Sequence, residues 1–166
     1  MNSPYNGRFE VTQIQSAAHD GLDLVGLDSK VIHSTVNGSV QYAGYENNDN
    51  KKRGFGLYVC VKGSDGNYYY YGHMSETKVK TGQIVNIGTV IGTEGNTGYS
   101  TGSHCHYCCR PNYCIGNALN ISDISGIPNK TGVYDDGHRP IDDAAGQQHR
   151  IDIYIDGQKK YTGLLD

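Results

Sequence analysis

The 166-residue chain has no tryptophan, only two phenylalanines and four prolines, and no apolar run near the roughly 20 residues that a membrane-spanning helix needs. It also has no excess of positive charge, because 14 basic and 17 acidic side chains give a formal net charge of −3. Binding to nucleic acid needs a clustered basic surface, and Lys51-Lys52-Arg53 is only a short run. These absences argue against a membrane span and against nucleic acid as a partner.

The first four residues, Met1-Asn2-Ser3-Pro4, do not combine a charged region with an apolar core. We therefore expect no export signal in this chain. Its length fits one ordinary domain, which is large enough to bury a core although only 36% of the residues are hydrophobic.

Glycine and tyrosine are abundant, with 23 and 14 residues, and helix-forming runs are few. This composition predicts an all-β protein, a single small domain with an antiparallel sheet core. Alternation and turn residues predict strands at 9–14, 36–42, 55–61 and 68–71, with a hairpin turn at 64–67 that delivers His73 just beyond a strand end. Residues 76–80 are expected to form a short helical or irregular link.

The last third of the chain follows a different pattern. Asn120 is expected to open a capped helical turn that stops at Gly126. Residues 135–148 are polar and predict a linker, and residues 150–163 predict two strands around an Asp156-Gly157 turn. An isolated hairpin is marginal in water, so we expect it to pack on the rest of the domain or to pair with something outside this chain.

Two short strings contain possible metal ligands. His19 and Asp23 lie four residues apart, and their imidazole and carboxylate could both bind one divalent ion such as zinc. His104 and His106 alternate, so on a strand they face the same side about 6.5–7 Å apart. One of them could bind the metal while the other faces a substrate.

These strings follow an order that resembles the LytM/lysostaphin-type zinc endopeptidases, which cut peptide bonds in bacterial peptidoglycan. The resemblance covers roughly residues 7–110. It is carried by Gly7-Arg8-Phe9 with Val11-Thr12-Gln13, by His19 through Leu24 (His-x-Gly-x-Asp-Leu), by Gly38 through Gly44, by Tyr71-Gly72-His73-Met74, by Val79-x-x-Gly82-x-x-Val85-x-x-Gly88-x-x-Ile91-Gly92, by Gly95 through Gly98 and by Ser100 through His106.

The resemblance implies a metallopeptidase core at residues 1–115 and a C-terminal extension at 116–166. Loops would wall a groove that contains one zinc ion, Zn2+, bound by His19, Asp23 and His106. His73 and His104 would be the catalytic pair, with His104 as general base and His73 stabilising the oxyanion. Tyr71 is expected to flank the groove, and residues 46–54 to form part of its wall.

The implied partner is a bacterial peptidoglycan peptide, and the implied place of action is the bacterial cell wall. Without an export signal, such an enzyme would be delivered by a phage particle or lysis system, or the chain would be a piece of a longer exported protein. The alternative function is a catalytically silent peptidoglycan-binding or activator domain on the same fold.

The remaining histidines and the cysteines have no place in these motifs. His33, His138 and His149 are expected to be ordinary structural or surface residues. Cys105-x-x-Cys108 permits a structural zinc site, but the favoured interpretation is that the five cysteines are small buried residues in a reduced protein. Strand alternation predicts that Cys105 points away from the site and that Cys108 shares the face of His106. A cysteine protease is also possible in principle, although no motif assigns a nucleophile.

Overall fold

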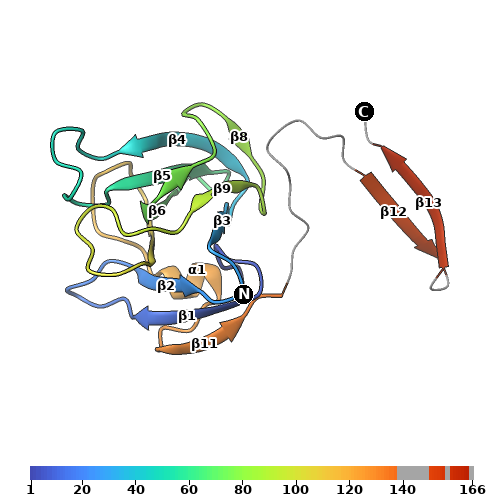
Figure 1. The fold of residues 1–166 in the computed structure, drawn as a ribbon, viewed down its shortest axis with the longest axis horizontal. Helices are drawn as coiled ribbons and strands as arrows, with labels where there is room; N and C mark the ends of the chain where they lie inside the picture. Colours follow the sequence, from blue (N-terminus) through green and yellow to red (C-terminus); the bar gives the residue numbers. More distant parts are fainter. Residues whose placement is uncertain (138–149, 156–157, 165–166) are drawn as a thin grey trace.

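In the computed structural model, two antiparallel sheets form the framework of the chain (Figure 1). The structure describes residues 1–137 with their side chains, and beyond them the backbone of residues 150–155 and 158–164. The elements are β1 (Arg8–Gln13), β2 (Leu22–Gly26), β3 (Val31–His33), β4 (Gly38–Tyr45), β5 (Leu57–Gly63), β6 (Tyr68–Met74), β7 (Glu76–Thr77), β8 (Ile84–Val85), β9 (Val90–Thr93), β10 (Cys105–Arg110), α1 (Ile121–Ser125), β11 (Gly132–Asp135), β12 (Arg150–Ile155) and β13 (Gln158–Leu164).

The larger sheet has the strand order β11-β1-β2-β10-β6-β5-β4-β8, and the smaller sheet has the order β3-β9-β7. All the strand pairs in these two sheets are antiparallel. The predicted all-β class with an antiparallel sheet core is therefore confirmed. Strand β10, which carries His106, lies near the middle of the larger sheet between β2 and β6.

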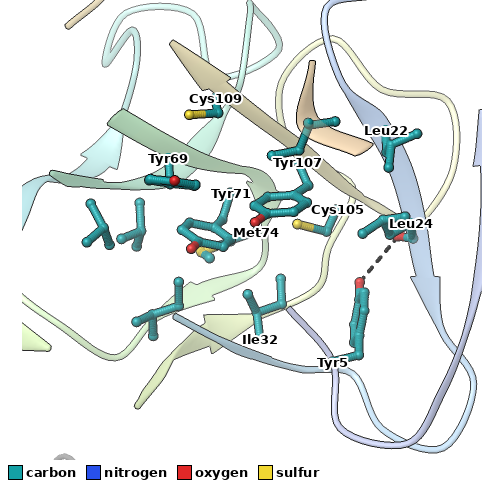
Figure 2. Packing of buried hydrophobic residues seen from close by; sticks show 14 of the residues in the cluster. Tyr5, Leu22, Leu24, Ile32, Tyr69, Tyr71, Met74, Cys105, Tyr107 and Cys109 are labelled. Atoms are coloured by element: carbon teal, nitrogen blue, oxygen red, sulfur yellow. Dashed lines mark hydrogen bonds between the residues drawn. The ribbon is translucent and has the colours of Figure 1, made fainter. Parts of the chain in front are cut away.

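The main core lies on one face of the larger sheet. Alternate side chains of β6 and β10, such as Tyr71 and Tyr107, point into this core and pack with Ile32 and Ile91 from the smaller sheet (Figure 2). Alternation places the intervening side chains, among them Tyr70 and Cys108, in a second cluster on the opposite face. The same strands thus supply a buried core on one side and the foundation of a site on the other.

Several predicted local features are present. The turn at 64–67 joins β5 to β6, and Gly66 has a φ of 87°, a conformation that glycine adopts at no steric cost. The side chain of Asn120 caps α1, and Gly126 ends this helix with a φ of 75°.

Two short strands differ from the sequence-based expectation. Residues 76–77 form β7 against β9, where a helical or irregular link over 76–80 was expected. Asp135 ends β11, which pairs with β1, rather than opening the linker. Both strands are short, and their pairing partners rather than a local pattern of their own determine their conformation.

The segment after residue 115 shares the sheet and the core with the part before it. Ile121 and Ile127 are fully buried in the main core, and β11 forms one edge of the larger sheet. Strands β12 and β13 pair with each other. The predicted turn at 156–157 and residues 138–148 of the predicted linker lie outside the described residues. A division of the chain at residue 115 stays a proposal.

Candidate metal centre

The predicted ligands come from two neighbouring strands and the turn before one of them. Asp23 on β2 is directly opposite His106 on β10, and such pairs place their Cβ atoms about 4.5–5.5 Å apart. His19 lies in the preceding turn, where its backbone pairs with Ser16. Nδ1 of His19 lies 2.9 Å from the carbonyl oxygen of Ile14, which orients Nε2 towards Asp23.

Gly21 allows this turn to approach β10 closely. A Cβ atom at this position would lie 2.5 Å from the carbonyl oxygen of Tyr107 and 3.0 Å from Nε2 of His106. Because Gly21 has no side chain, the turn can lie against β10, and both His19 and Asp23 are placed next to His106.

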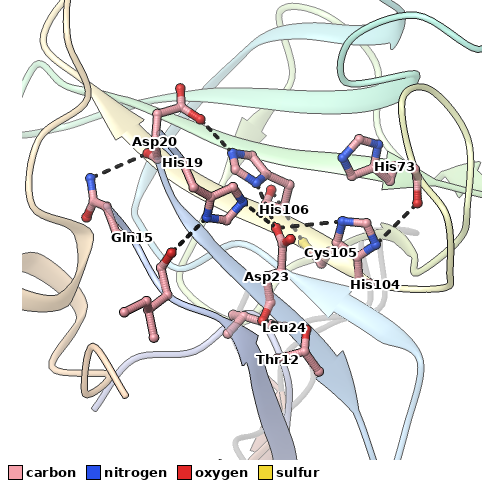
Figure 3. Close-up of polar contacts among 12 residues, drawn as sticks. Thr12, Gln15, His19, Asp20, Asp23, Leu24, His73, His104, Cys105 and His106 are labelled. Carbon is pink, nitrogen blue, oxygen red and sulfur yellow. Dashed lines mark hydrogen bonds and ion pairs between the residues drawn. The ribbon is translucent and has the colours of Figure 1, made fainter. Parts of the chain in front are cut away.

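The three predicted ligands converge (Figure 3). Oδ1 of Asp23 lies 3.1 Å from Nε2 of His19 and 2.8 Å from Nδ1 of His106, and the three donor atoms all lie within 4.8 Å of one another. Two imidazole nitrogens and one carboxylate oxygen, with the side open to the cleft left for another ligand, are the donors that catalytic zinc sites use.

The charges at this point favour a cation. Burial lowers the pKa of His106, but contacts with Asp20 and Asp23 raise it more, and the pKa lies well above its ordinary value. Burial raises the pKa of Asp23, but the hydrogen bond to His106 and the charges of His106, His104 and His19 together outweigh this effect, and the pKa is lowered. The two carboxylates thus stabilise a positive charge, as a metal ligand set does, and the residues present fit a divalent ion.

His73 and His104 lie beside this donor set, with their ring centroids 4.6 Å apart. Nδ1 of His73 is 2.7 Å from the carbonyl oxygen of Thr97, and Nδ1 of His104 is 2.8 Å from that of Gly102. Both rings therefore leave Nε2 for another partner, and Nε2 of His104 lies 3.6 Å from Oδ1 of Asp23. Burial, reinforced by His104, lowers the pKa of His73 to about 4, so this ring is neutral at pH 7.

The sequence predicted His73 just beyond the end of a strand, but His73 lies within β6. Its φ is 61°, an unusual value for a residue with a side chain, and it occurs where the pairing of β5 with β6 shifts register. This unusual backbone conformation occurs at His73, whose ring lies next to that of His104.

A cavity of about 500 Å3 opens over these side chains. The wall predicted at residues 46–54 contributes Glu46 and Gly54. The cavity is lined by Gln13, Ala18, His19, Asp23, Glu46, Gly54, Phe55, His73, Tyr99, Ser100, Thr101, His104 and His106.

Tyr71 does not flank this cavity, and that expectation is wrong. Its ring is fully buried in the core on the other face of the sheet, stacked on Tyr107. Its hydroxyl accepts from the backbone N–H of Thr35 at 3.0 Å. Although it lies close to His73 in the sequence, it has a structural role.

The cysteines lie as strand alternation predicts. Cys105 is buried in the main core and Cys108 in the cluster on the side of His106. Because the two thiols lie on opposite faces of β10, Cys105-x-x-Cys108 does not form a zinc site. All five cysteines are free thiols, and four of them, all but Cys114, are buried.

Asp20 is a site residue that the motif analysis did not single out. Its carboxylate contacts both His106 and Arg110, and it forms a second possible donor set with His106 and Cys108. The available signal was its place inside the His19 to Asp23 string, but Arg110 lies 90 residues away and no local pattern connects the two.

Two histidines and one carboxylate, beside two further histidines and an open cavity, form a donor set that catalytic zinc sites use. The model of Peptidase family M23 matches residues 17–120, and the chain belongs to this family. The resemblance to the LytM/lysostaphin type is thereby confirmed.

Individual relatives agree. The chain is 38% identical over 93 residues to the peptidoglycan DD-endopeptidase ShyC of Vibrio cholerae, a match that covers 56% of this chain and 20% of that protein. The catalytic domain of the prophage-encoded M23 protein EnpA of Enterococcus faecalis, solved as a point mutant, superposes with a TM-score of 0.60 and 26% identity, over 72% of this chain and 94% of that one.

The structure of the antimicrobial peptidase lysostaphin from Staphylococcus simulans gives a TM-score of 0.59 and 26% identity, over 70% of this chain and 47% of that one. The chain spans between a fifth and about a quarter of the length of the first curated relatives that it matches, 20–27%.

Proposed function

We propose that this protein is a zinc-dependent endopeptidase that hydrolyses peptide bonds in bacterial peptidoglycan, in the stem peptide or the cross-bridge. The observation that carries the proposal is the convergence of His19, Asp23 and His106 in a cavity that His73 and His104 also line. Membership of Peptidase family M23 and a relative named as a peptidoglycan endopeptidase support the reaction and the substrate class.

Nε2 of His19, Oδ1 of Asp23 and Nδ1 of His106 would hold the metal ion. When bound, zinc supplies Lewis acidity, which polarises the scissile carbonyl group and makes water more acidic. The remaining work falls to the two histidines whose Nδ1 atoms face backbone carbonyl groups.

His104 would act as the general base. With its Nδ1–H donated to the carbonyl oxygen of Gly102, Nε2 carries a lone pair that accepts the proton of the attacking water. The same bond fixes the ring plane, so the accepting atom is in place before substrate arrives.

His73 would stabilise the negative charge that develops on the substrate oxygen. Because its Nδ1–H faces the carbonyl oxygen of Thr97, it can donate from Nε2 only in its protonated form. The lowered pKa keeps the ring neutral in the free protein, and a developing negative charge beside it would favour uptake of a proton from solvent at Nε2, which the cavity reaches.

An extended peptide would lie in the cavity, with residues 46–54 and 99–101 beside it. Within the described part of the chain, no helix is long and apolar enough to cross a membrane. We propose that the protein acts at the bacterial cell wall and, given the prophage-encoded relative, that delivery by a phage particle or lysis system is one route. The other is export as part of a longer protein.

The test combines zinc stoichiometry on metal-reconstituted protein with the release of new amino groups from purified peptidoglycan. We expect one zinc per chain and release that a chelator abolishes. His106→Ala should lose both, whereas His104→Ala should keep its fold and zinc but lose turnover. Equal release by His104→Ala and wild type would refute the assignment, and zinc without any release would favour the silent binding or activator domain.

A further inference from the structure

The side of His106 that faces away from Asp23 is held by a second carboxylate. Oδ1 of Asp20 lies 3.0 Å from Nε2 of His106 (Figure 3). Oδ2 of Asp20 lies 2.5 Å from Nη2 of Arg110. The His106 side chain is only 8% exposed, so water has little access to the ring, whereas the Asp20 side chain is 40% exposed and reaches it from the side of solvent.

Both nitrogens of this ring therefore have a carboxylate partner, and the two contacts have different consequences. If Nε2 carries the proton and donates it to Asp20, Nδ1 is left with the lone pair that a metal ligand needs. Nδ1 is the atom that faces Asp23, at 2.8 Å. The contact with Asp20 thus selects the tautomer of His106 that can bind a metal at the proposed centre.

Arg110 determines where the Asp20 carboxylate lies. Every second residue of a strand faces the same side, so residues 106, 108 and 110 of β10 share one face, and Arg110 lies on the side of His106. The guanidinium group lies over the rings of Phe55 and Tyr70, 6.0 and 5.6 Å from their centroids, and from there it reaches Asp20. A carboxylate between a guanidinium group and an imidazole has both oxygens engaged.

A second metal site is the competing explanation, because Asp20, His106 and Cys108 also bring three donor atoms within 4.8 Å of one another. Arg110 argues against it. A permanently charged guanidinium group 2.5 Å from Oδ2 of Asp20 repels a cation at that carboxylate and occupies one of its oxygens. The arrangement suits a carboxylate that orients a ligand better than one that binds a metal itself.

We infer that Asp20, held by Arg110, is a positioning residue that fixes the Nε2–H tautomer and the ring orientation of His106. The inference rests on the proposed function, since it concerns metal binding by His106. It assigns a role to a residue inside the motif whose side chain does not itself bind the metal.

The test measures zinc affinity by competition with a chromophoric chelator, for wild type, Asp20→Ala and Asp20→Asn. Loss of a carboxylate partner of a metal-bound histidine typically weakens metal binding about 10–100-fold, and we expect a loss in this range for Asp20→Ala. Asp20→Asn should lose less, because its amide oxygen can still accept from Nε2–H. In the 15N spectrum of the zinc-loaded protein, the Nε2–H proton of His106 should exchange faster with solvent in both variants.

Asp28→Ala is the matched control. Asp28 pairs with Arg8 at 2.8 Å in an exposed Asp–Arg contact outside the cavity lining, so its loss should leave zinc affinity unchanged. If Asp20→Ala does not fold, the isosteric Asp20→Asn decides the question by the same two measurements.

The outcomes separate the two proposals. Failure of the wild type to bind zinc would refute the proposed metal centre. Wild-type zinc binding with unchanged affinity and unchanged Nε2–H exchange in the Asp20 variants would overturn the positioning role alone. Uptake of two zinc ions by wild type, with the second lost in Cys108→Ser, would also overturn it by making Asp20 a ligand.

Discussion

Replacing Glu94 by alanine should destabilise the fold strongly, because this side chain joins four separate parts of the chain at a point with no solvent exposure. Oε2 of Glu94 accepts from the hydroxyl of Tyr5 at 2.6 Å and from the backbone N–H of Gly26 at 2.8 Å. Oε1 accepts from Ser103 at 2.5 Å and from Lys30 at 3.1 Å. Since Ser103 directly precedes His104, the network also anchors the segment that enters the site.

The size of the effect follows from the donors that would be left behind. Tyr5 has a second acceptor in the carbonyl oxygen of Leu24 at 3.3 Å, and Lys30 is half exposed, so these two can find other partners. Gly26 N–H and Ser103 lose a charged acceptor, at about 1.5–3 kcal/mol each, so Glu94→Ala should cost about 3–6 kcal/mol in the free energy of unfolding.

Glu94→Gln should cost less, about 1–2 kcal/mol, because the amide oxygen can serve Gly26 while the amide nitrogen faces the Ser103 hydroxyl, which can accept. The assay is urea unfolding followed by far-ultraviolet circular dichroism, since the chain has no tryptophan. The midpoint should fall with little change in slope.

Glu76→Ala is the control for the loss of a glutamate. Glu76 contacts Lys78 at 2.6 Å in an exposed pair, and its removal should change the stability by no more than about 0.5 kcal/mol. A loss below about 1 kcal/mol in Glu94→Ala, or equal losses in the alanine and glutamine variants, would refute the argument from buried donors.

Three further predictions concern pH, the core and the turn before β2. Burial raises the pKa of Glu94, but its hydrogen bonds, with Ser103 first, outweigh burial and lower the pKa below the ordinary 4.5. The ionised carboxylate therefore stabilises the folded protein fully above that pH, and this contribution is lost as the pH falls further. Urea midpoints should decline on acidification less steeply in Glu94→Gln than in wild type. Tyr71→Phe leaves the buried N–H of Thr35 without its acceptor and should cost about 1–3 kcal/mol by urea unfolding. Tyr107→Phe should cost less, because the Thr35 hydroxyl keeps its hydrogen bond to Tyr71. A larger loss in Tyr107→Phe than in Tyr71→Phe would contradict this. Gly21→Ala forces a Cβ to within 2.5 Å of the Tyr107 carbonyl oxygen, so it should lower both the thermal midpoint and zinc affinity, and wild-type values for both would show that the turn can move away without cost.

The sequence predicts those parts of the fold whose pattern is local. Alternation in 55–61 and 68–71, with turn residues between them, is sufficient for the β5–β6 hairpin. The same alternation correctly separates Cys105 from Cys108. It does not say which face of a four-tyrosine run is buried, and the error over Tyr71 follows from this ambiguity.

Features that depend on distant partners could not be predicted from local patterns. β11 is a strand because β1 lies beside it, and nothing in residues 132–135 alone requires that conformation. The φ of 61° at His73 depends on the register shift between β5 and β6. The contact of Asp20 with Arg110 depends on the pairing of β2 with β10, which also brings Asp23 opposite His106.

The pairing of β2 with β10 explains how a turn-rich sequence can hold the ligand set in a fixed arrangement. Side chains of β10 alternate between the two faces of the sheet. Because the ring of Tyr107 is packed in the core, the neighbouring His106 is held on the opposite face, at a height above the sheet that the core packing fixes. A shift of β10 by one residue against β2 would turn His106 into the core and Tyr107 towards the site, so that each face of the sheet would receive the wrong kind of side chain. The cost of that exchange falls on core packing and on buried charge together. The apolar residues that never touch the cavity therefore hold the donor atoms of His106 and Asp23 in register.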